Sequence, residues 1–198
     1  MSSSASPRRS DTADRMLDAA ERLVQVRGYN GFSYADVAQQ LQITKASLHY
    51  HFPGKAELGE ALITRYAERF GEALDEIDRE ITSARGKLDA YVGIYSNVLA
   101  DGRMCLCGIL AAEYATLPPA MRDAVTRFFE GNEAWLITVL SAGQADGSLS
   151  VNGSLNTTSE VILSGLEGAM LIARTRGTSE RFKAAATRLL DTLSPGWE

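Results

Sequence analysis

The chain of 198 residues has only two cysteines, Cys105 and Cys107, separated by a single leucine. Two such thiols do not make a disulfide framework, and we expect a reducing, cytoplasmic environment. Long apolar runs are also missing, because the longest, such as 169–173, span a few residues and a membrane-crossing helix needs about 20. Residues 1–10 are Ser-rich without an apolar stretch, so we expect a disordered tail and no secretory signal. These absences exclude a disulfide scaffold and a membrane protein.

The residue types of common enzyme and metal sites are equally sparse. Histidine occurs twice, at His49 and His51, and side chains at this spacing fall on different faces of a helix, which argues against joint metal binding. The sequence contains no Ser/His/Asp set and no phosphate-binding glycine loop. We therefore expect no enzyme activity, no metal and no cofactor.

Strand patterns and internal repeats are absent as well, and the periodicity is helical throughout. In the first segment Met16, Ala20 and Leu23 recur at the spacing of one helix face. Glycine, proline and serine clusters divide the chain into further helical segments. The pattern predicts an all-α protein with a helix-turn-helix domain over 11–55 and a helical domain over 56–198. We expect the longer helices at 11–27, 55–83, 87–100, 103–116, 118–143, 155–175 and 179–193.

Charge is unevenly distributed between these two predicted domains. Residues 1–55 carry seven Lys or Arg against five Asp or Glu, whereas the whole chain has a net charge of −5. A slightly basic end on an acidic chain suggests a polyanion that contacts that end only.

The segment 33–52 has the pattern of a helix-turn-helix, with two short helices and the capping residue Thr44 at the start of the second. In this motif the second helix points its N-terminus into the major groove, where short polar side chains contact base edges and phosphates. Rings and cations nearby can bind phosphate oxygens. The candidate DNA-binding residues are Ser33, Thr44, Lys45, Ser47, His49, Tyr50, His51 and Lys55.

Residues 11–62 resemble the DNA-binding domain of TetR-family regulators of the TetR/AcrR type. The similarity lies in Arg-Gly-Tyr at 27–29, in Phe-Ser-Tyr-Ala-Asp-Val-Ala at 32–38 and in the run Ile-Thr-Lys-Ala-Ser-Leu-His-Tyr-His-Phe-Pro-Gly-Lys-Ala-Glu-Leu at 43–58. Two positions depart from the family pattern: His49 stands where tyrosine is usual, and Gly54 replaces a polar cap. The resemblance implies a repressor that binds double-stranded operator DNA and is released by a small-molecule inducer.

A homodimer is expected because one helix-turn-helix makes too few contacts for tight specific binding. In TetR-like proteins the last two long helices of each subunit form an intersubunit four-helix bundle. Small residues on one side of the predicted 155–175 helix would let two backbones approach closely. These interface candidates are Ser164, Gly165, Gly168 and Ala169.

The middle of the chain is the candidate ligand-binding region, because aromatic residues concentrate there. Glu113 is the candidate polar anchor, and ordinary core packing is the alternative role for the aromatics. The candidate ligand-binding residues are Tyr91, Tyr95, Cys107, Glu113, Tyr114, Phe128 and Trp135.

The segment 103–119 resembles the sixth helix of a TetR subgroup with a cysteine near its start, in which some members sense electrophiles or oxidants. A thiol at a helix N-terminus has a lowered pKa. We expect Cys107 to face the ligand cavity and Cys105 to point away from it. A thiol-based repressor is therefore one alternative to a reversible inducer. A DNA-binding protein that takes no ligand is another, and both cysteines could instead be small buried residues.

Overall fold

The computed structural model describes residues 9–196, which form nine α-helices and one 3-10 turn and contain no β-strand. The predicted all-α fold is confirmed. The elements are α1 (Arg9–Arg27), α2 (Tyr34–Leu41), α3 (Lys45–His51), α4 (Lys55–Glu80), α5 (Ala84–Ala100), α6 (Leu106–Ala112), the 3-10 turn (Tyr114–Thr116), α7 (Pro119–Ala145), α8 (Leu155–Arg176) and α9 (Ser179–Asp191).

Two parts of the chain fold differently from the expectation. Helix α1 begins at Arg9, inside the stretch predicted to be a tail, and residues 1–8 of that stretch lie outside the described residues. The helix predicted over 103–116 is a short α6 followed by the 3-10 turn. It starts late because the Met104 amide donates to the Gln25 carbonyl of α1 at 3.2 Å, which holds the preceding residues outside a helix.

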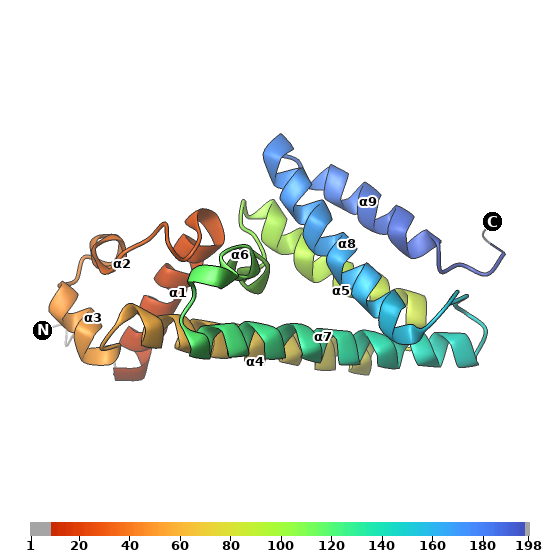
Figure 1. The fold of residues 1–198 in the computed structure, drawn as a ribbon, viewed down its shortest axis with the longest axis horizontal. Helices are drawn as coiled ribbons and strands as arrows, with labels where there is room; N and C mark the ends of the chain where they lie inside the picture. The colour runs from red at the N-terminus through yellow and green to blue at the C-terminus, as the bar shows by residue number, and fades with distance from the viewer. Residues whose placement is uncertain (1–8, 197–198) are drawn as a thin grey trace, which may run out of the picture.

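The helices α1–α3 gather at one end of the molecule, and we call them the head (Figure 1). Helix α4 leaves the head and runs beside α7 along the length of the molecule. Helices α8 and α9 pack on each other, α9 also packs on α5, and α8 packs on α7. We call α4–α9 the body. Helix α1 contacts both α4 and α6, so it joins the head to the body.

Local contacts in the head explain why its short helices form at these residues. Ser33 precedes α2, and its amide donates to Oδ2 of Asp36 at 2.7 Å, as one half of a capping box. Gln42 ends α2 in the left-handed conformation with φ 55°, which reverses the chain into α3. Thr44 then caps α3 with its hydroxyl, and Leu48 anchors the helix in the core with no exposed surface.

Candidate functional site

Helix α3 presents most of its polar side chains to solvent. Lys45 and His49 are exposed, and 66% of Tyr50 is exposed, the largest fraction of any large apolar or aromatic side chain described. Ser47 and His51 are half-buried. Because Leu48 fixes the opposite side of the helix in the core, these groups form an outward surface at the tip of the head.

The N-terminus of α3 carries the geometry expected of a recognition helix. The Thr44 hydroxyl accepts a hydrogen bond from the Ser47 amide at 3.2 Å. Tyr34 of α2 donates its hydroxyl to the carbonyls of Phe52 and Gly54, at 2.9 and 2.5 Å, and so holds the turn between α3 and α4. Nδ1 of His49 lies 3.0 Å from the Pro53 carbonyl, which orients the imidazole at that same turn.

Lys55 is directed into the head. Its Nζ donates to the Phe32 carbonyl at 2.6 Å and lies over the rings of Tyr29 and Phe32, 4.5 and 4.4 Å from their centroids. Burial lowers the pKa of the Lys55 amine, and the nearby Glu113 carboxylate partly offsets this effect. The contact between Lys55 and a DNA phosphate stays a prediction, and in this structure the amine stabilises the head.

Glu113, expected to anchor a ligand, lies at the contact between head and body. Its carboxylate accepts from the Tyr29 amide at 2.5 Å and from the Asn30 amide at 3.3 Å. Gly28, with φ +82°, lies against the same carboxylate, and a Cβ there would come within 2.8 Å of Oε1. Glu113 therefore caps the turn that follows α1 and ties α6 to the head.

Other body segments also bind the end of α1. Arg103, in the connection between α5 and α6, donates to the Gln25 side chain at 3.0 Å. Arg174 in the last turn of α8 donates to the Val26 carbonyl. The end of α1 and the turn after it are thus held by contacts that reach the end of α6, α8 and the α5–α6 connection.

Four of the candidate ligand-binding residues meet in the body. Tyr91 is fully buried between Tyr95 and Trp135, with ring centroids 5.3 Å from each, and Phe128 joins them through Phe70. The Tyr91 hydroxyl lies 3.0 Å from that of Tyr95 and donates to Oδ1 of Asn132 at 2.9 Å. We call this set the aromatic cluster.

Tyr114 stands apart from the aromatic cluster. It is 42% exposed, and its ring lies beside the Arg122 guanidinium with a separation of 6.0 Å. An opening of about 180 Å³ between α4 and α7 reaches Phe70, Phe128 and Asn132, so the aromatic cluster has an approach from the surface.

Cys105 and Cys107 are both buried in the body, and the expectation that Cys105 points away is wrong. Cys105 is the N-cap of α6 rather than a residue within the helix, so its Sγ turns inward and accepts from the Tyr66 hydroxyl at 3.6 Å. Burial, with the nearby Glu167 carboxyl, raises the pKa of both thiols. The predicted lowering by the helix N-terminus is therefore outweighed.

Glu167 is the functional candidate that the sequence reasoning missed. Its carboxyl is enclosed beside Cys105, Oε1 has no hydrogen-bond partner among the described residues, and burial raises its pKa to about 7. A Cβ on Gly108 would collide with this carboxyl, so the glycine makes room for it. The available signal was helical spacing, because Glu167 falls on the same face as the buried Leu163 and Met170.

The candidate interface residues on α8 lie on or beside an exposed apolar face. Ser164 and Gly168 are exposed, and a Cβ on Gly168 would meet nothing within 4 Å. Gly165 instead faces α9 of its own chain, where a Cβ would lie 2.8 Å from Leu189. Three large apolar side chains are exposed along α8: Val161 at 52%, Leu171 at 47% and Ile172 at 63%.

No group of three or more His, Cys, Asp or Glu side chains between residues 9 and 196 could hold a metal ion. In the same range, none of the helices has the length and apolar character needed to cross a membrane.

The all-helical fold and the outward polar face of α3 define a helix-turn-helix protein. The family described as bacterial regulatory proteins of the tetR family matches residues 16–62, and the tetracyclin repressor-like C-terminal domain matches residues 84–189. A crystal structure of a TetR-family regulator from Agrobacterium tumefaciens has 33% sequence identity and a TM-score of 0.90, covering 93% of this chain and 98% of that one. The chain belongs to the TetR family of transcription regulators.

Curated relatives agree with this assignment. The HTH-type transcriptional repressor NemR of Escherichia coli K12 is 24% identical over 191 residues, which span 93% of this chain and 94% of NemR. The transcriptional regulator AcuR of Cereibacter sphaeroides is 26% identical over 157 residues, spanning 75% of this chain and 69% of AcuR.

Proposed function

We propose that the chain is a ligand-responsive repressor that binds a palindromic operator as a homodimer and is released by a small-molecule inducer. The observation that carries the proposal is the outward face of α3, where Lys45 and Tyr50 are exposed on a helix whose opposite side is fixed by Leu48. A helix that presents such groups at the tip of a domain has the arrangement needed to enter a major groove.

Dimerisation through α8 is supported by its exposed face. Val161, Leu171 and Ile172 lie along one side of the helix with Gly168 between them, and an exposed apolar face of this kind supports a protein-protein contact. Pairing this face with that of a second copy buries it and relates the two heads by a two-fold axis.

The inducer is proposed to bind at the aromatic cluster and to approach through the opening between α4 and α7. Phe70, Leu74 and Phe128 give the opening a largely apolar lining, and Asn132 supplies a hydrogen-bonding amide among them. This environment suits a small, largely apolar molecule that carries one hydrogen-bond donor. Such a ligand releases DNA only if it binds the released conformation more tightly than the DNA-bound one.

Thiol-based sensing receives less support. Cys105 lies beside Tyr66 in the body, but burial and Glu167 disfavour the thiolate that reacts with electrophiles. A reversible inducer is therefore the preferred proposal.

Selection from a random duplex library tests DNA recognition for an operator of any sequence. We expect a two-fold symmetric motif with half-sites about one helical turn apart. The Lys45→Ala/Tyr50→Ala variant should bind the selected duplex about a hundredfold more weakly, because a base-edge and a phosphate contact are lost together. Arg79→Ala, an exposed arginine near the end of α4, is the matched control and should bind like the wild type. Unselective binding, or equal binding by all three proteins, contradicts the proposal.

Light scattering tests the interface. Gly168→Leu should give monomers because it separates backbones that pack closely, whereas Gly131→Leu, at an exposed helical glycine of α7, should remain dimeric. If the Gly168→Leu protein remains dimeric, the interface does not lie at this face of α8.

A further inference from the structure

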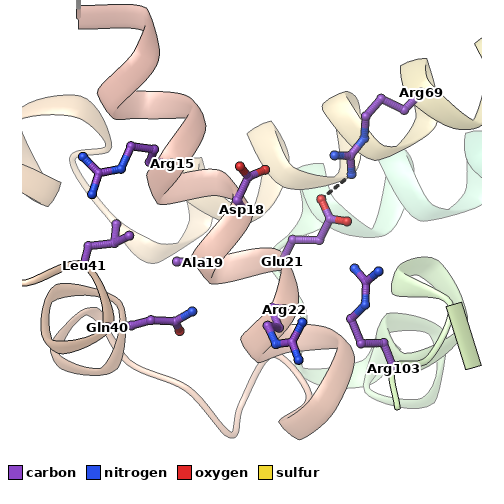
Figure 2. Close-up of a pocket in the computed structure, with 9 residues that line it drawn as sticks. All are labelled: Arg15, Asp18, Ala19, Glu21, Arg22, Gln40, Leu41, Arg69 and Arg103. Atoms are coloured by element: carbon purple, nitrogen blue, oxygen red, sulfur yellow. Dashed lines mark hydrogen bonds and ion pairs between the residues drawn. The ribbon is translucent and has the colours of Figure 1, made fainter. Parts of the chain in front are cut away.

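A groove of about 420 Å³ lies between head and body, and its lining is rich in arginine. Figure 2 shows Arg15 and Arg22 on α1, Arg69 on α4, Arg103 on the α5–α6 connection and Gln40 on α2 around it. Four guanidinium groups around one groove are unusual in a chain whose net charge is −5. The groove is separate from the aromatic cluster and from the outward face of α3.

The acidic side chains of the groove already have partners. Glu21 is buried and accepts from Arg69 and, at 3.3 Å, from Arg65 of α4. Asp18 forms an ion pair with Arg65 at 2.8 Å. Both carboxylates are therefore paired with arginines of α4, and neither forms an ion pair with the arginines of α1.

Arg15 and Arg22 are exposed and form no ion pair with any of the described residues. Arg103 is held in place by Gln25 and by Asp101, at 3.0 and 2.6 Å, yet its Nε is buried without an acceptor in the described part of the chain. A buried donor without an acceptor costs free energy unless a ligand or water completes it.

We propose that this groove binds a small anion carrying two or more negative charges on phosphate or carboxylate groups. Guanidinium groups bind such groups through paired, charge-assisted hydrogen bonds, and two of the arginines have no carboxylate partner within residues 9–196. The volume accommodates a metabolite-sized molecule, and the Gln40 side chain supplies a further neutral donor. In this proposal the groove binds a free small anion. The alternative ligand is a phosphate of the DNA backbone.

The position of the groove gives the anion a mechanical consequence. Arg15, Arg22 and Gln40 belong to the head, whereas Arg69 and Arg103 belong to the body. An anion bound to both parts stabilises the orientation of the head seen in this structure. The site itself does not depend on the proposed operator binding, so it can be tested without DNA.

Calorimetric titration with inorganic pyrophosphate, in the absence of metal ions and DNA, tests the site. We expect saturable binding to the wild type that weakens as salt rises. The Arg15→Gln/Arg22→Gln variant should bind about tenfold more weakly, because the two guanidinium groups without an ion-pair partner among the described residues are lost. Arg79→Gln, with an exposed arginine outside the groove, is the matched control and should bind like the wild type. Both groove positions are exposed, so the variant is expected to fold.

Nuclear magnetic resonance of the wild type provides an independent readout. Pyrophosphate should shift the Nε–H resonance of Arg103 and the side-chain amide of Gln40. Equal affinity in the variant and in Arg79→Gln, shifts confined to other regions, or absence of saturable binding each overturn the proposal.

Operator binding by the Arg22→Gln variant distinguishes a free anion from a DNA phosphate as the ligand of the groove. If the groove takes a free anion, Arg22→Gln should bind the selected operator as the wild type does when no pyrophosphate is present. If Arg22→Gln loses operator affinity and its salt dependence becomes shallower, the groove binds the DNA backbone and the free-anion site is wrong.

Discussion

Helix α3, at the tip of the head, and the aromatic cluster of the body hold their polar groups in opposite ways. On α3 these groups lie at or near the surface, and the hydrogen bond that starts the helix joins residues close in sequence, Thr44 with Ser47. In the aromatic cluster they are enclosed and bonded across helices, as Tyr91 of α5 is to Asn132 of α7. An enclosed polar group loses its water when the protein folds, so its substitution changes stability strongly. An exposed group can change recognition while the fold stays almost as stable.

The largest effect on stability is expected at Glu167. Its pKa is raised to about 7 from 4.5, so the folded protein keeps the proton at pH values where the unfolded chain has released it. Stability contributed by this group is present below about pH 4.5 and is lost as pH rises to about 7. Glu167→Gln removes this pH dependence of stability. Above about pH 7 the variant should be more stable than the wild type by about 3 kcal/mol.

Denaturant unfolding at a series of pH values and one fixed protein concentration measures this difference. Glu160→Gln, at an exposed glutamate of the same helix, is the matched control. A wild-type curve parallel to that of Glu167→Gln across the whole range would falsify the enclosure of the carboxyl.

The next largest effect on stability is expected at the contact between the head and the body. Glu113→Gln keeps an acceptor but loses the negative charge that accepts from the Tyr29 and Asn30 amides. We expect a loss of about 2 to 3 kcal/mol, because two charge-assisted hydrogen bonds are replaced by weaker neutral ones. Hydrogen exchange should show faster exchange of these two amides, with α5 and α8 unchanged. Glu130→Gln, exposed on α7, controls for charge alone, and unchanged exchange at Tyr29 would show that Glu113 does not hold the head.

Two tyrosines of the aromatic cluster, Tyr91 and Tyr95, should differ in how much their hydroxyl groups contribute to stability. Tyr91 donates to Asn132 and therefore accepts from Tyr95. Tyr91→Phe leaves both neighbours without their partner and should cost about 2 kcal/mol, whereas Tyr95→Phe removes only the end of the chain and should cost about 1 kcal/mol. The two unfolding free energies, compared with the same denaturant, test this order. A larger loss in Tyr95→Phe would reverse the assigned donors.

The same contrast explains how much could be predicted from the sequence. The helix-turn-helix could be predicted because the features that form it are local. A cap at Thr44, a turn after Leu41 and a buried Leu48 all fall within one short stretch of the sequence. For the candidate ligand site, the sequence showed only a concentration of aromatic residues. The orientations of Glu113 and Cys105 could not be predicted, because the contacts that orient them come from residues more than thirty positions away. Helix periodicity places a residue on a face but does not identify the neighbouring helix.

The smallest effect is expected at the start of α3. Thr44→Ala removes the hydroxyl that accepts from the Ser47 amide at 3.2 Å, and loss of such a cap at an exposed helix end costs about 0.5 kcal/mol. Thr44→Ser retains the hydroxyl and should keep the cap. Because the contact is local and exposed, the Ser47 amide should exchange faster in Thr44→Ala while the buried amides of α5 and α8 keep their protection. If body amides also lose protection, the head and the body unfold together, and the contrast between the locally bonded α3 and the enclosed aromatic cluster does not hold.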